Sequence, residues 1–168
     1  MQARPGSCGV SIPMCEVKLM KVGTMMPVMN ELLDEGKRVR ITVTGMSMYP
    51  FLRHNKDSVE LMKTNYTKVH RGDIVLIVGD DNQYILHRII SKKKKYFYLN
   101  GDAGHVCEGP LYPEQIIAKV CNIWRNDHCI PCSNKIFKIL SFLWFLVFPF
   151  RYIIIEVYFH LSKFLKTS

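Results

Sequence analysis

Apolar and polar positions alternate with a period of two through most of the central part of the chain. In RVRITVT (38–44) the pattern places Val39, Ile41 and Val43 on one face, as in a half-buried strand. Glycine, aspartate, asparagine or lysine bounds each further run of this kind, which is typical of strands joined by hairpins. These runs are DSVEL (57–61), GDIVLIVG (72–79), YILHRIIS (84–91), KYFYLN (95–100) and IIAKVCNIW (116–124). The sequence therefore predicts a mainly β domain of short antiparallel strands.

One short helix is predicted before these strands, in PVMNELLDEG (27–36). Pro27 favours a helix start and Gly36 a helix end. The predicted apolar face consists of Val28, Met29, Leu32 and Leu33. Residues 1–26 are interpreted as an N-terminal extension, with disorder as an open alternative, and residues 27–132 as the β domain.

The C-terminal part, residues 133–168, is predicted to be a hydrophobic, helical, membrane-associated tail. Its apolar core, 136–161, exceeds the roughly 20 residues that span a bilayer. Pro149, Arg151 and Glu156 oppose a simple span, because each charge is costly at a bilayer centre. A re-entrant or interfacial helix and a buried core helix remain alternatives. The aromatic residues in 141–150 favour association with a membrane. We expect the protein at the cell membrane, and the sequence does not determine on which side of the membrane the β domain lies.

The net charge of the chain indicates which classes of partner it could bind. A net charge of +9 together with 48% hydrophobic residues excludes a disordered chain and favours an acidic partner. Apart from the block at 92–95, lysine and arginine are spread along the chain without interleaved aromatic residues, so nucleic acid is not predicted as a partner. The block itself is interpreted as an exposed hairpin tip or as a lipid-docking site.

Six cysteines show no repeated spacing that would define a disulfide framework. The tightest pair, Cys129 and Cys132, lies in HCIPC beside His128, but a structural zinc site needs further ligands that the sequence does not offer. We therefore predict no metal and no other cofactor, and interpret these residues as ordinary or redox-labile cysteines.

The segment TVTGMSMYPFL (42–52) carries the main candidate for chemistry, Ser47. Gly45 permits a sharp bend and Pro50 fixes the backbone after it, while Met46 and Met48 are expected to anchor the turn by burial. A serine held in this way is suited to be a nucleophile, although an ordinary turn serine is the alternative. The flanking residues Met46, Met48 and Pro50 are the predicted substrate-binding residues.

Two further residues complete a possible triad. His87 lies in an otherwise apolar strand and shares a face with Ile85 and Ile89, which predicts either a general base or a hydrogen-bonded core histidine. Asp102 lies between glycines in NGDAG, where an acidic turn residue is also common. Serine, histidine and aspartate converge from separate elements in triads of unrelated folds.

Four segments, TGMSMYPFL, RGDIVLIV, LHRII and NGDA, resemble in this order the signal peptidase I superfamily of serine peptidases, over roughly residues 38–124. Histidine before Arg88, where the bacterial enzymes have lysine, is similar to the endoplasmic-reticulum and archaeal type. The resemblance implies Ser47 as nucleophile, His87 as general base and Asp102 as orienting carboxylate.

We thus predict a serine endopeptidase with a signal-peptidase-like β domain, which acts on an extended peptide or precursor protein. The alternative is a membrane-attached module that retains the fold and binds peptides without cleaving them.

Overall fold

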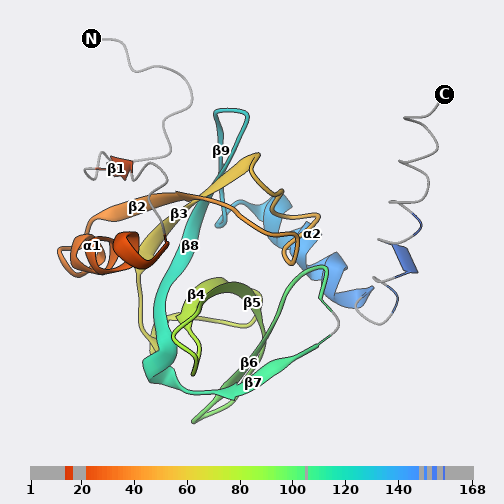
Figure 1. Ribbon diagram of the computed structural model, residues 1–168. Helices are drawn as coiled ribbons and strands as arrows, with labels where there is room; N and C mark the ends of the chain where they lie inside the picture. The colour runs from red at the N-terminus through yellow and green to blue at the C-terminus, as the bar shows by residue number, and fades with distance from the viewer. Residues whose placement is uncertain are drawn as a thin grey trace.

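The computed structural model describes residues 14–16, 22–104, 106–147, 150, 153, 154 and 157, and their fold is mainly β (Figure 1). One nine-stranded sheet has the order β1-β2-β3-β8-β4-β5-β6-β7, and β9 pairs with β8 outside this path. The strands are β1 (Met14–Glu16), β2 (Arg38–Thr42), β3 (Asp57–Lys63), β4 (Ile74–Val78), β5 (Tyr84–Lys92), β6 (Phe97–Asn100), β7 (Glu108–Leu111), β8 (Ile116–Arg125) and β9 (His128–Pro131).

Every pairing in the sheet is antiparallel except that of β1 with β2. The mainly β prediction is confirmed, and each predicted run contributes one of the strands β2, β3, β4, β5, β6 and β8. The short strands β1, β7 and β9 were not predicted. Pattern alone gave no signal for β7 because its sequence, EGPL, contains the glycine and proline that strands usually lack.

Two apolar cores hold the sheet together. The first packs α1 (Val22–Asp34) against β2, β3 and β8, and also takes up Met48 and Leu52 from the segment that carries Ser47. The second lies among β4, β5, β6 and β8 and is built around Phe97, Leu99 and Ile77, which are fully buried. The first core therefore fixes the serine segment to the sheet.

Helix α1 begins five residues before Pro27, so the prediction that Pro27 starts the helix was wrong. The buried stripe explains the difference, because Met26 joins Met29 and Leu33 at spacings of three and four residues. Val28, predicted on the buried face, is 50% exposed because it lies outside this stripe.

The helix ends as predicted at Gly36. The φ of Gly36 is +77°, the Lys37 amide donates to the Leu32 carbonyl, and the Gly36 amide donates to the Leu33 carbonyl. This is the Schellman arrangement, which favours glycine at the left-handed position.

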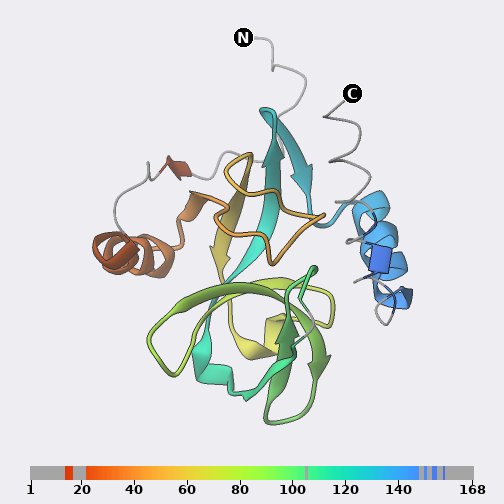
Figure 2. The ribbon, with the colours of Figure 1, turned by 45° about the vertical axis from the view of Figure 1, so that its right-hand side comes forward.

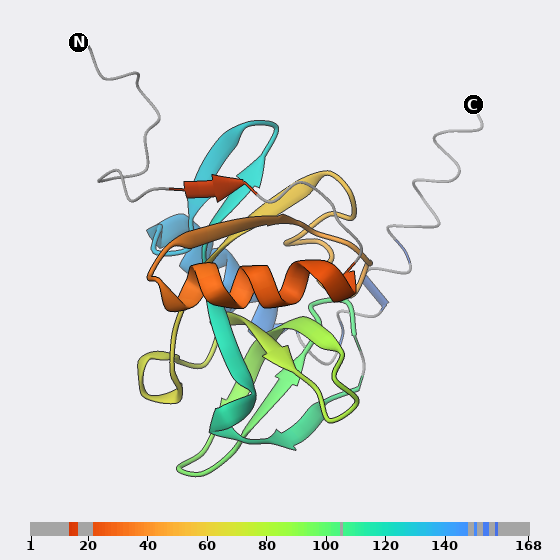
Figure 3. The same ribbon diagram turned by 60° about the vertical axis from the view of Figure 1, so that its left-hand side comes forward.

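A second helix, α2 (Lys135–Leu146), forms the first part of the predicted apolar tail. Its first turn is capped by Asn134, whose side-chain oxygen accepts from the Ile136 amide at 2.8 Å. The two helices lie on opposite sides of the molecule (Figures 2 and 3). Among the described residues, none of the helices combines the length and apolar character needed to cross a bilayer. Most of the predicted tail after residue 147, and residues 1–13 and 17–21 of the predicted extension, lie outside the described residues.

We expect Leu33→Ala to lower the free energy of unfolding by about 2–5 kcal/mol, because Leu33 is fully buried between α1 and the sheet. Val28→Ala, on the exposed side of the same helix, should change it by less than about 0.5 kcal/mol. Chemical denaturation of both variants measures the difference. Equal effects would contradict the packing of α1 described here.

Candidate functional site

Ser47 is exposed at the surface, on the segment of residues 43–56 between β2 and β3. The base of this segment is closed by the Val43 amide, which donates to the Asp57 carbonyl at 2.9 Å. Met48, 2% exposed, inserts into the first core as predicted, whereas Met46 is 45% exposed and does not anchor the turn. The serine hydroxyl is thus carried by a short segment with one apolar anchor beside it.

A glycine bend precedes the serine. Gly45 has a φ of +87°, a conformation that side chains disfavour, and its amide donates to Nδ1 of His54 at 2.9 Å. His54, from the far side of the same segment, therefore supports the bend. Nothing in the sequence pattern indicated this contact.

Asp57, at the end of the serine segment, is fully buried and accepts hydrogen bonds from two arginines. Arg53 donates through its backbone amide and its guanidinium, and Arg125 of β8 donates at 2.7 Å. Arg125 also donates to the carbonyl of Phe51, inside the segment, at 2.8 Å. Burial raises the pKa of Asp57, but the hydrogen bonds from Arg125 and Arg53 outweigh burial and hold it below its usual value.

Ser47 and His87 meet at Gly101, directly after β6. A Cβ atom at Gly101 would lie 2.5 Å from the Ser47 carbonyl oxygen and 3.1 Å from Nε2 of His87. The amide of Ala103 donates to that same Ser47 carbonyl at 2.8 Å. Only a glycine leaves room for this approach, so the turn after β6 brings the backbone of Ser47 and the ring of His87 close to the same residue.

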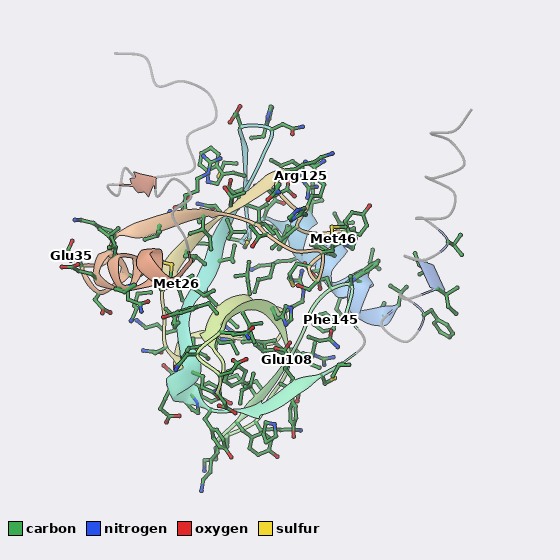
Figure 4. The ribbon with its side chains drawn as sticks, viewed as in Figure 1. Met26, Glu35, Met46, Glu108, Arg125 and Phe145 are labelled. Atoms are coloured by element: carbon green, nitrogen blue, oxygen red, sulfur yellow. The ribbon has the colours of Figure 1, made fainter. Side chains whose placement is uncertain are left out.

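The carboxylate beside His87 is that of Glu108 in β7, which was not predicted from the sequence. Glu108 is labelled in Figure 4. Its Oε1 lies 3.0 Å from Nδ1 of His87, and the two side chains are 32% and 13% exposed. Among the described residues, neither Nδ1 of His87 nor the second oxygen of Glu108, Oε2, has a hydrogen bond of acceptable geometry. A carboxylate beside this nitrogen favours the tautomer with the proton on Nδ1, in which Nε2, the atom close to Gly101, is able to accept a proton.

Asp102 does not take the position predicted for it beside His87. Both of its oxygens accept from Arg88, at 2.8 Å from Nε and 2.7 Å from the terminal nitrogen, and both side chains are almost fully buried. Arg88 also donates to the Gly72 carbonyl, at 2.9 Å. A buried guanidinium requires such a partner, so Asp102 holds the residue next to His87 rather than His87 itself.

The predicted substrate-binding residues occupy three different environments. Met46 is exposed next to Ser47, whereas Met48 is buried in the core and is not accessible to a substrate. Pro50 lines an open apolar pocket between the serine segment and α2, together with Phe51 and Trp144.

Among the residues that the structure describes, no group of three or more histidine, cysteine or acidic side chains is placed to hold a metal ion. Cys129 of the HCIPC motif is disulfide-bonded, and Cys132 is a free thiol. Burial raises the pKa of Cys121 to about 11 and that of Cys132 to about 12, which keeps both thiols protonated and unreactive.

No protein-family model matches this chain, and no curated protein matches it.

Asp57, Arg53 and Arg125 form a group that we call the Asp57 cluster, and it makes the stability of the chain depend on pH. Because the pKa of Asp57 is lower in the folded chain than in the unfolded one, its contribution is complete above the unfolded value near ~3.9. The contribution is lost as the pH falls through the lower, folded value. Asp57→Asn should lower the free energy of unfolding at neutral pH by about 1–3 kcal/mol and flatten its decline below pH ~4.

Denaturation between pH 2 and 7 tests this expectation. Asp34→Asn is the control, because Asp34 forms an exposed pair with Lys63, which contributes little. A variant at position 57 with the stability and pH dependence of the original chain would show that the cluster does not hold the segment.

Proposed function

We propose that this chain is a serine endopeptidase that cleaves a peptide bond through an acyl-enzyme on Ser47, with His87 as general base. One observation carries the proposal: the Ser47 backbone and Nε2 of His87 approach the same point at Gly101, while Glu108 lies 3.0 Å from the other ring nitrogen. This is the order of groups found in serine triads, in which a carboxylate orients a histidine that faces the serine.

In the proposed reaction, the Ser47 hydroxyl oxygen attacks the carbonyl carbon of the substrate while its proton passes to Nε2 of His87. The protonated ring then gives this proton to the departing amine as the carbon–nitrogen bond breaks. Water then attacks the resulting ester while His87 accepts its proton, and the ring returns this proton to the Ser47 oxygen as the ester bond breaks and the acid is released. Glu108 stabilises the positively charged ring during both steps.

In this proposal, Asp102 is a positioning residue. Its paired oxygens fix Arg88 and the turn at Gly101, so it acts on the site through the backbone on which His87 and Gly101 lie. The proposal gives the orienting role, which the sequence-based prediction assigned to Asp102, to Glu108, a residue that had no role in that prediction.

An extended peptide or precursor protein is the proposed substrate. Ser47 is exposed, and β7, which carries Glu108, is the last strand of the sheet order and leaves one edge unpaired within that order. A sheet edge binds extended chains through backbone hydrogen bonds. The resemblance to signal peptidase I, stated above from the sequence, supports the same substrate class and a preference for small side chains before the cut.

Ser47→Ala should abolish both cleavage and labelling of the purified chain by a fluorophosphonate, because the nucleophilic oxygen is absent. The melting temperature should remain nearly unchanged, since the side chain is exposed. A chain that binds peptides but is neither labelled nor able to cleave would be a binding module. Labelling that persists in Ser47→Ala would place the nucleophile elsewhere.

The two acidic residues should respond differently to removal of their charge. Glu108→Gln should lower kcat/KM by at least about tenfold with little loss of stability, because it weakens support for the charged ring. Asp102→Asn should lower the free energy of unfolding by about 3–5 kcal/mol, because it leaves Arg88 buried without its partner. Kinetics and thermal unfolding of both variants give the comparison, and a stable Asp102→Asn with the larger kinetic defect would restore Asp102 as the orienting carboxylate.

A further inference from the structure

Helix α2 is attached to the elements of the proposed site by one face. Trp144 donates through its ring nitrogen to the Asp102 carbonyl at 3.1 Å, and Ser141 accepts from Arg88 at 3.3 Å. Phe51 of the serine segment packs edge-on against Phe137 and Trp144, with ring centroids 5.7 and 6.1 Å apart. The helix is therefore an integral part of the folded domain.

The opposite face of α2 is apolar and open. Its side chains are between 49% and 67% exposed, namely Ile136, Ile139, Phe142, Leu143 and Leu146. On a helix these positions lie on one side, away from Ser141. So many adjacent large apolar side chains on one surface are typical of an interaction site rather than of scattered exposure.

Most charged side chains around this face are basic, although Asp73 lines the pocket beside Lys138 and Phe142. Helix α2 contains no acidic residue and carries the exposed Lys135 and Lys138. Arg71, whose guanidinium lies 5.0 Å from the ring centre of Phe145, adds a basic group at the margin. The sequence of residues 133–168 has five basic residues and one acidic residue.

We propose that the apolar face of α2 binds the surface of an anionic lipid bilayer, with the helix axis parallel to the membrane. An apolar helix face bordered by basic residues is the pattern of interfacial helices. The helix has 12 residues, a length of about 18 Å, which is shorter than the roughly 30 Å hydrocarbon core. A second copy of the chain is the less favourable occupant, because the lysines of two identical faces would repel one another, whereas anionic lipids attract them.

The orientation of α2 on the membrane has a consequence for the proposed site. This consequence rests on the proposed peptidase function. Since the inner face of α2 is bonded to Asp102 and Arg88, a bound helix holds Ser47 at a fixed height above the bilayer. The peptide bonds presented to Ser47 are then those close to a membrane surface. Lipid binding itself does not require that Ser47 be reactive.

Co-sedimentation of the full chain with vesicles tests the proposal, using Ser47→Ala as the background so that cleavage plays no part. Vesicles of phosphatidylcholine alone are compared with equimolar phosphatidylcholine and phosphatidylglycerol. We expect stronger binding to the anionic vesicles. Ile139→Glu should weaken this binding by at least about tenfold. It removes an aliphatic side chain that would insert into the lipid, and it adds a negative charge that anionic lipids repel.

Val28→Glu is the matched control, because Val28 is a β-branched residue that is 50% exposed on α1, against 58% for Ile139. It should bind vesicles like the parent chain. Replacing Lys135 and Lys138 by glutamine should weaken binding to anionic vesicles by about fivefold for each lysine and leave binding to neutral vesicles unchanged.

Three outcomes would overturn the proposal. These are an absence of vesicle binding, equal binding by Ile139→Glu and Val28→Glu, and a dimer in analytical ultracentrifugation that Ile139→Glu dissociates without any change in lipid binding. If vesicle binding follows the expected pattern and the original chain is neither labelled nor active, the proposed peptidase function is refuted and the proposed binding of α2 to lipid is supported.

Discussion

The buried ion pair between Arg88 and Asp102 joins the parts of the molecule on which the proposed site depends. Arg88 lies in β5 beside His87, and its guanidinium contacts the turn after β6, the Gly72 carbonyl before β4 and Ser141 of α2. The ring of Phe51, from the serine segment, lies 4.7 Å from the guanidinium carbon. Replacing such a pair by apolar residues is often neutral for stability, whereas a buried charge without its partner is costly. The pair therefore constrains where these elements lie more than it adds to their stability.

Two close contacts turn that constraint into a site. Gly101, next to Asp102, leaves space for the Ser47 carbonyl and for Nε2 of His87, and the Asp57 cluster closes the serine segment from its other end. The hydrogen-bonded ion pairs of Asp57 with Arg53 and Arg125 fix the base of the segment. Beside the serine, the buried side chain of Met48 fixes the segment to the core. A nucleophile benefits from such fixation, because a small displacement from the reactive geometry lowers the rate strongly.

Helix α2 relates this site to the surroundings of the protein. Its inner face contacts the same Arg88 and Asp102 that order the site, and its outer face is apolar and bordered by positive charge. A single rigid element thus links a candidate membrane surface to the candidate nucleophile. The two proposals are separable by experiment, yet the same hydrogen bonds support both.

The sequence by itself determined the mainly β fold, because alternation with a period of two follows directly from the geometry of a strand with one buried face. It also predicted the turn that exposes Ser47 and the strand that carries His87, because glycine, proline and an isolated polar residue among apolar ones are local signals. The partner of His87 was decided by tertiary structure alone. Glu108 and Asp102 both lie in a stretch, NGDAGHVCEGP, whose sequence has no strand pattern. Only the pairing of β6 with β7 and the burial of Arg88 show which of the two lies beside the ring. Which charged groups pair depends on their distance and burial in the folded chain. The order of residues in the sequence does not show these distances.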